Sequence, residues 1–109
     1  MSLERTLLMN QLFAYYGNLL TDKQKEMLSL YYEEDYSLAE IAEHYQISRQ
    51  GVFDNIKRAE QALENYESQL HLLQLRNRRL ELYQQLNQQL QNQPSQHVLD
   101  ELIKLEYEL

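Results

Sequence analysis

The sequence predicts an all-α protein, and three observations support that fold class. The 109 residues include only two glycines and one proline, whereas an all-β domain needs turn residues about every 8 to 12 positions. Apolar residues recur at the roughly 3.6-residue period of a helix rather than alternating as in a strand. Three Ser or Thr residues stand where helix N-caps are expected, each just before an apolar period.

The composition also limits where the chain works and what it binds. There is no cysteine, so disulfides and thiolate metal sites are excluded, as suits a reducing compartment. The N-terminus lacks a signal peptide pattern and no apolar run is long enough to span a bilayer, so we expect a cytoplasmic protein. The net charge is −7, which opposes non-specific binding to nucleic acid.

The first two helices are predicted before residue 33. Residues 4–16 form the first, with Leu8, Leu12, Tyr15, Tyr16 and Leu19 on one face. The pair at 17 and 18, Gly-Asn, is a plausible stop because both residues tolerate a left-handed backbone. A capping box at residues 21–24 opens the second helix, and the acidic run 33–35 ends it as a solvated loop.

Residues 37–58 predict a helix-turn-helix. Ser37 and Glu40 repeat the capping-box spacing, and Ser48 caps a second helix that begins at Arg49. Ala42 supplies the small residue needed where two helices cross closely. The turn residue Gln46 would hold a left-handed backbone less cheaply than Gly or Asn, at a cost of roughly 1 kcal/mol. This segment carries three acidic and three basic side chains, so it is neutral within an acidic chain.

The residues after Leu63 change in character, because residues 66–90 are rich in Leu, Gln, Asn and Arg. A single helix from Arg49 to Gln91 would extend about 65 Å, so it either bends near Ser68 or projects and pairs with another chain. The break around Pro94 precedes a final amphipathic helix. We therefore expect a helix-turn-helix domain at 1–65 and a C-terminal helical extension at 66–109, packed on the same domain or on a dimer partner.

The second helix of the helix-turn-helix carries the candidate nucleic-acid-binding residues. In DNA-binding examples its first turn enters the major groove, where Arg suits guanine, Gln and Asn suit adenine, and Lys suits phosphate. Asp54 on the same face would repel phosphate, and the alternative is three capped helices whose charges face water. The candidate residues are Ser48, Arg49, Gln50, Asn55, Lys57 and Arg58.

Residues 20–60 resemble region 4 of sigma factors, through the LTDKQ opening, the SLAEIA run from Ser37 and the Ser48-Arg49-Gln50 triplet. More narrowly, DYSLAEIAE, SRQGVFDNIKR and ENYE resemble the YlxM family of small bacterial helix-turn-helix proteins. The resemblance implies a sigma region 4-like fold without a wing, and a DNA-binding regulator associated with the signal recognition particle pathway. It assigns the six candidate residues to the family's second-helix motif, and Gly51 stands where alanine is usual.

Other chemistry has weaker support. The histidines at 44, 71 and 97 are far apart, so no metal site is expected, and there is neither a phosphate-cradling glycine loop nor a nucleophile elbow. We therefore expect no enzyme activity and no cofactor. Arg76, Arg78 and Arg79 are interpreted as a solvated helix face pairing with Glu81, with a second phosphate contact as the alternative.

Two function hypotheses follow. The first is a DNA-binding regulatory protein that forms a homodimer through its C-terminal helices, with RNA as another ligand. The second is a protein-protein or RNA-binding accessory module of the signal recognition particle, favoured by the net charge of −7 and by Asp54.

Overall fold

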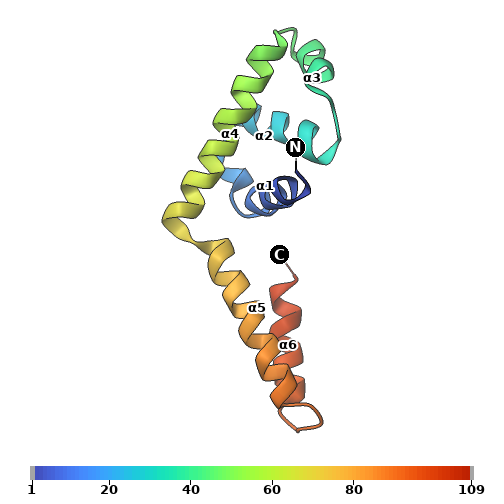
Figure 1. The fold of residues 1–109 in the computed structure, drawn as a ribbon, viewed down its shortest axis with the longest axis vertical. Helices are drawn as coiled ribbons and strands as arrows, with labels where there is room; N and C mark the ends of the chain where they lie inside the picture. The colour runs from blue at the N-terminus through green and yellow to red at the C-terminus, as the bar shows by residue number, and fades with distance from the viewer. Residues whose placement is uncertain (1, 109) are drawn as a thin grey trace. The chain divides into compact units, whose positions relative to one another are not determined.

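The computed structural model describes residues 2–108, and over this range the protein is all-α, as the sequence predicts (Figure 1). It divides into two compact units, one ending at His71 and the other beginning at Leu72. In the first unit the elements are α1 (Leu3–Tyr16), the 3₁₀ turn η1 (Gly17–Leu19), α2 (Asp22–Leu28), the π-helical turn η2 (Ser29–Glu33), α3 (Leu38–Tyr45) and α4 (Arg49–Leu70).

The three predicted N-caps are all present. Thr21 and Ser37 each form a full capping box, with Gln24 and Glu40 respectively reaching back to the cap residue's backbone N–H. Ser48 caps α4 by accepting a hydrogen bond from the N–H of Gly51. Each cap satisfies amide groups that have no partner inside the helix, which is why these three helices begin where the sequence predicts.

The core of the first unit forms where α1, α2 and α3 pack against α4. The predicted apolar face of α4 is confirmed, since Val52, Ile56, Ala59 and Leu63 are all buried. The predicted face of α1 is partly wrong: Met9 is buried with Leu12 and Tyr16, whereas Leu8 and Leu19 are exposed. The buried face of α1 is the side that packs against α4. The spacing of apolar residues alone did not identify that side.

The predicted stop after α1 uses a different backbone from the one expected. Gly17 has φ −56°, in the right-handed region, and the chain continues into η1. Leu19 consequently leaves the regular helix and no longer shares its face. Within residues 2–108 the left-handed backbone conformation occurs instead at Asp35, Gln46, His71 and Asn92.

The long helix from Arg49 ends at Leu70, because His71 adopts a left-handed backbone with φ 57° and ψ 27°. A residue in that conformation cannot continue a right-handed helix. The break lies three residues beyond the bend considered near Ser68. The division expected between residues 65 and 66 falls inside α4, since the change in composition there does not interrupt the backbone hydrogen bonds of the helix.

The second unit is an antiparallel hairpin of α5 (Leu72–Gln89) and α6 (Gln96–Glu106) (Figure 1). The connection contains Pro94, as predicted, and a left-handed Asn92 with φ 64°. No helix within residues 2–108 is both long and apolar enough to cross a membrane.

Candidate nucleic-acid interface

The turn between α3 and α4 is tight and well bonded. Gln46 takes the left-handed conformation that the sequence predicts, with φ 56° and ψ 47°. Its N–H and that of Ile47 both donate to the carbonyl of Ala42, the latter at 3.0 Å. These bonds satisfy the last carbonyl groups of α3. The turn therefore fixes the direction in which α4 begins.

Arg49 and Gln50 are exposed at the first turn of α4. The cap hydrogen bond from Gly51 N to Ser48 Oγ measures 2.9 Å. Ser48 accepts that bond, so its hydroxyl proton remains available to a phosphate oxygen. A Cβ at residue 51 would stand 3.2 Å from Ser48 Oγ, closer than ordinary contact. Glycine at this position thus leaves room for the cap.

The outward face of α4 combines recognition chemistry with a negative charge. Gln50, Asp54, Lys57 and Gln61 recur at helical spacing on this side, opposite the buried face. The side-chain amide of Gln50 donates to Asp54 Oδ1 at 3.0 Å, so part of its hydrogen-bonding capacity is already used. Asp54 therefore lies beside the glutamine that would read a base.

Asn55, Lys57 and Arg58 differ in how available their polar groups are. The amide of Asn55 donates to the carbonyl of Gly51 at 2.8 Å, so the side chain turns back onto its own helix. Lys57 Nζ lies 3.4 Å from Glu60 Oε1 and 5.4 Å from the centre of the Phe53 ring. Arg58 is exposed and, like Arg49, has no ion-pair partner among residues 2–108. Arg49 and Arg58 are thus the cations most available to a polyanion.

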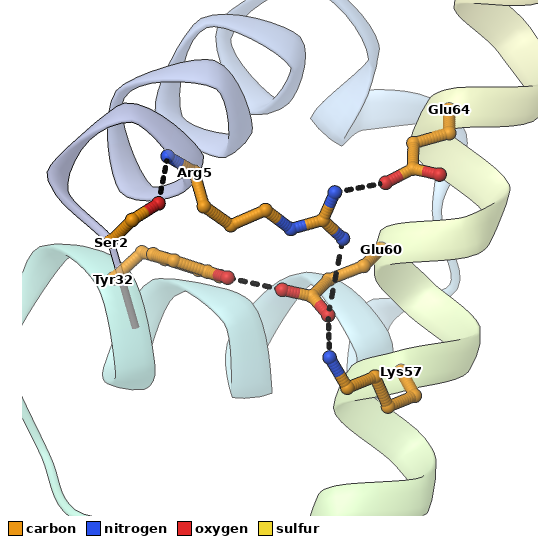
Figure 2. A network of polar contacts seen from close by, with 6 residues as sticks. All are labelled: Ser2, Arg5, Tyr32, Lys57, Glu60 and Glu64. Atoms are coloured by element: carbon orange, nitrogen blue, oxygen red, sulfur yellow. Dashed lines mark hydrogen bonds and ion pairs between the residues drawn. The ribbon is translucent and has the colours of Figure 1, made fainter.

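A buried carboxylate, Glu60, holds α4 against the rest of the unit (Figure 2). Its side chain is 3% exposed, with Arg5 of α1 at 3.8 Å and Lys57 at 3.4 Å from Oε1. The hydroxyl of Tyr32 in η2 donates to Oε2. Arg5 also pairs with Glu64 at 2.6 Å. This cluster was not predicted from the sequence. The sign of it is that Glu60, an ionisable residue, directly follows Ala59 on the edge of the apolar face of α4.

The phenol groups of several tyrosines donate to glutamates in the same way. Tyr16 donates to Glu67 at 2.7 Å, and Tyr45 of α3 donates to Glu26 of α2 at 2.5 Å. The hydrogen bond from Tyr45 lowers the pKa of Glu26. The pKa of Tyr32 is raised, mainly because its hydroxyl is desolvated and secondly because it donates to Glu60. These contacts link α3 and α4 to the elements behind them.

The arginine cluster in α5 has internal partners. Arg78 pairs with Glu81 at 3.0 Å, which agrees with the interpretation as a paired helix face. Arg79 pairs closely with Glu106 of α6, and Arg76 lies 4.0 Å from the same carboxylate. The positive charges therefore have counter-charges within the hairpin, which weakens the case for a second phosphate contact.

Comparison with known proteins identifies the family to which this chain belongs. A family model described as "Putative helix-turn-helix protein, YlxM / p13 like" matches residues 3–103. The UPF0122 protein YlxM of Bacillus subtilis is 54% identical over 88 residues, which cover 81% of this chain and 80% of that protein. A UPF0122 protein of Halalkalibacterium halodurans is 48% identical over 102 residues, covering 94% of each chain. Another, from Bacillus licheniformis, is 48% identical over 107 residues, covering 97% of this chain and all of the relative.

Proposed function

Because the chain belongs to the YlxM / p13-like family of helix-turn-helix proteins, we propose that it binds DNA with the first turns of α4. The observation that carries the proposal is the exposed start of α4, where a tight turn and the Ser48 cap present Arg49 and Gln50 to solvent. In this mode Arg49 reads a guanine edge and Gln50 reads a base once Asp54 releases its amide. Lys57 and Arg58 contact phosphate, which positions the helix without reading sequence.

The proposed role is transcription regulation in the cytoplasm, by binding rather than catalysis. One copy has a weak electrostatic footprint, since the segment 37–58 is neutral and the whole chain carries −7. We propose that two copies act together as a homodimer, so that two recognition helices engage two half-sites about one helical turn apart. Two such footprints on one duplex would offset the acidity of the chain.

The test is a titration of fluorescent duplex DNA with the full-length protein. The probes are a random-sequence duplex and a duplex enriched from a random library by the wild-type protein. Binding should weaken steeply as salt rises, because counterions are released from the phosphates. Arg49→Ala combined with Lys57→Ala should weaken binding to the enriched duplex by on the order of 100-fold.

The matched control removes two lysines that lie outside the proposed interface. Lys23→Ala combined with Lys104→Ala changes the net charge by the same amount at two exposed positions. A loss of affinity in this control equal to that of the α4 variant would indicate a general charge effect. Unchanged binding by the Arg49 and Lys57 variant would reject the α4 surface.

A second candidate function is that of an accessory module of the signal recognition particle, binding its protein or its RNA. Its support is Asp54 in the middle of the outward face of α4, where a carboxylate opposes phosphate but suits a basic protein surface. Capture experiments with the particle's purified protein and purified RNA, run separately, distinguish these ligands. Under this hypothesis Asp54→Asn weakens capture of the protein, whereas under the DNA hypothesis the same change strengthens binding to DNA.

A further inference from the structure

The α5–α6 hairpin has an inner seam with few buried apolar residues. Leu73 and Leu99 are its buried hydrophobic residues within the described range, at 4% and 1% exposure. Polar contacts fix the register: Tyr83 Oη donates to Glu106 at 3.2 Å, and the side-chain amide of Gln96 donates to Asn87 at 2.5 Å. Gln96, at the start of α6, bonds to Asn87 near the end of α5. Glu106, at the end of α6, bonds to Tyr83 and Arg79, which lie earlier in α5, so the helices are antiparallel.

Each helix of the hairpin also carries a second apolar stripe that is open to solvent. The six side chains are between 40% and 63% exposed. They are Leu75, Leu82 and Leu86 of α5 with Val98, Leu102 and Leu105 of α6.

The two stripes lie on the same side of the hairpin. Leu82 directly precedes Tyr83, which bonds to Glu106 of α6. Leu102 directly precedes Ile103, which lies one helical turn after the buried Leu99 and so faces α5 as well. One residue back along a helix is a rotation of about 100°. Because the helices are antiparallel and face each other, the same step along each chain turns both stripes toward one lateral side. They therefore form one continuous surface, which we call the leucine face.

The opposite lateral side of the hairpin is polar. On α5 it carries Gln84 and Gln88, and on α6 it carries Asp100 and Lys104, all of them exposed. A hairpin that simply stood in water would not need this contrast between its two sides. Its asymmetry is that of a helix pair with one side covered.

The small size of the α5–α6 unit also indicates that its leucine face packs against a partner. It begins at Leu72 and holds fewer than about 40 residues, a size at which a single core seldom suffices without association or cross-links. Six half-exposed apolar side chains present on the order of 300 Å² of apolar surface. That fits the centre of a standard interface of about 800 Å² per partner once polar residues at its edge are added.

We infer that the leucine face packs against the leucine face of a second copy of this chain, forming a four-helix bundle from two hairpins. The contact is isologous, so each copy offers and receives the same residues. The charge distribution favours this occupant, since residues 72–109 hold four basic and five acidic side chains and thus little net charge. Most of the acidity that would repel a second copy lies in the first unit. This surface serves the homodimer of the proposed function, but its test does not involve DNA.

The experiment measures the association of the full-length chain by sedimentation equilibrium over a wide range of concentration. Leu82→Glu combined with Leu102→Glu should raise the dimer dissociation constant by on the order of 100-fold or more. The matched control, Gln84→Glu combined with Gln88→Glu, adds the same charge to the polar side. Its dimer dissociation constant should stay within about threefold of the wild-type value. A monomeric wild-type chain, or equal effects of the two double variants, would overturn the inference.

A second measurement avoids any dependence on how well the glutamate variants fold. Because the chain has no cysteine, Leu102→Cys and Gln84→Cys each introduce one thiol, on the leucine face and on the polar side respectively. Both positions lie away from the ends of the hairpin, so the result does not depend on which way the second hairpin runs. A bifunctional maleimide should link two chains through residue 102 and not through residue 84. Linkage through residue 84 that equals or exceeds linkage through residue 102, or linkage at neither position, would contradict the packing. If the wild-type chain dimerises through residue 102 but does not bind DNA, the proposed function is rejected and the proposed interface stands.

Discussion

Replacing the buried carboxylate Glu60 by alanine should destabilise the first unit more than any surface ion-pair change. The side chain is 3% exposed and sits among Arg5, Lys57 and Tyr32 (Figure 2). Alanine removes the acceptor of the Tyr32 hydroxyl, the counter-charge of Lys57 and one of the two carboxylates that pair with Arg5. It also leaves a small cavity between α4, α1 and η2.

The magnitude follows from how far each partner can return to water. Removing one member of a fully buried pair costs about 3 to 5 kcal/mol. Here the side chains of Arg5 and Lys57 are 37% and 55% exposed, so both cations recover hydration and most of that cost disappears. Loss of the hydrogen bond from the Tyr32 hydroxyl costs about 1 kcal/mol of stability, and the lost packing costs a similar amount. We expect a total of about 2 kcal/mol.

The assay is urea unfolding of the full-length protein followed by far-UV circular dichroism. The control is Glu64→Ala, which deletes the other carboxylate bound to Arg5 but at a side chain that is 43% exposed. Exposed pairs contribute about 0 to 1 kcal/mol, so this variant should stay close to wild type. If Glu60→Ala costs no more than Glu64→Ala, burial is not what gives this cluster its strength.

Three smaller predictions concern the turn, the cap and the hairpin. Gln46→Gly relieves the strain of a left-handed backbone at φ 56° but makes the unfolded chain more flexible. The net effect should be a free energy of unfolding about 0.5 kcal/mol higher in the same urea assay. A loss of stability would show that the glutamine side chain makes stabilising contacts. Ser48→Ala should cost about 1 kcal/mol and Ser48→Gly only a few tenths, with equal losses arguing against the cap. The hydrogen bond from Arg79 holds the pKa of Glu106 below its ordinary value. That contribution is present at neutral pH and lost as pH falls through the lowered pKa, so thermal unfolding of Glu106→Gln should depend less on acid than that of wild type; identical acid profiles would exclude this pair as a source of acid sensitivity.

Local hydrogen-bonding signals made much of the fold predictable from the sequence. The caps at Thr21, Ser37 and Ser48 are confirmed because each depends on residues within three positions of one another. The left-handed turn at Gln46 was predictable for the same reason. The apolar face of α4 is confirmed because a long helix repeats its pattern often enough to define one side.

Features that depend on distant residues were not predictable in the same way. His71 ends α4 although nothing in its neighbours marks a stop, and Glu60 is buried because Arg5 and Tyr32 arrive from other elements. The side-chain bonds of Gln50 and Asn55 to their own helix were also missed. The spacing predicts that these residues lie on a surface, but only the folded structure shows which of their polar groups already have hydrogen-bond partners.

The most direct test of DNA binding through α4 is to titrate isotopically labelled protein with the enriched duplex and follow every backbone amide by NMR. The proposed interface predicts that the largest shifts fall on the turn and first turns of α4, from Ser48 to Arg58, and weaken as salt is raised. Amides of α5 and α6 should change little. Shifts centred on the hairpin, or none at low salt, would contradict the assignment of α4 as the recognition helix.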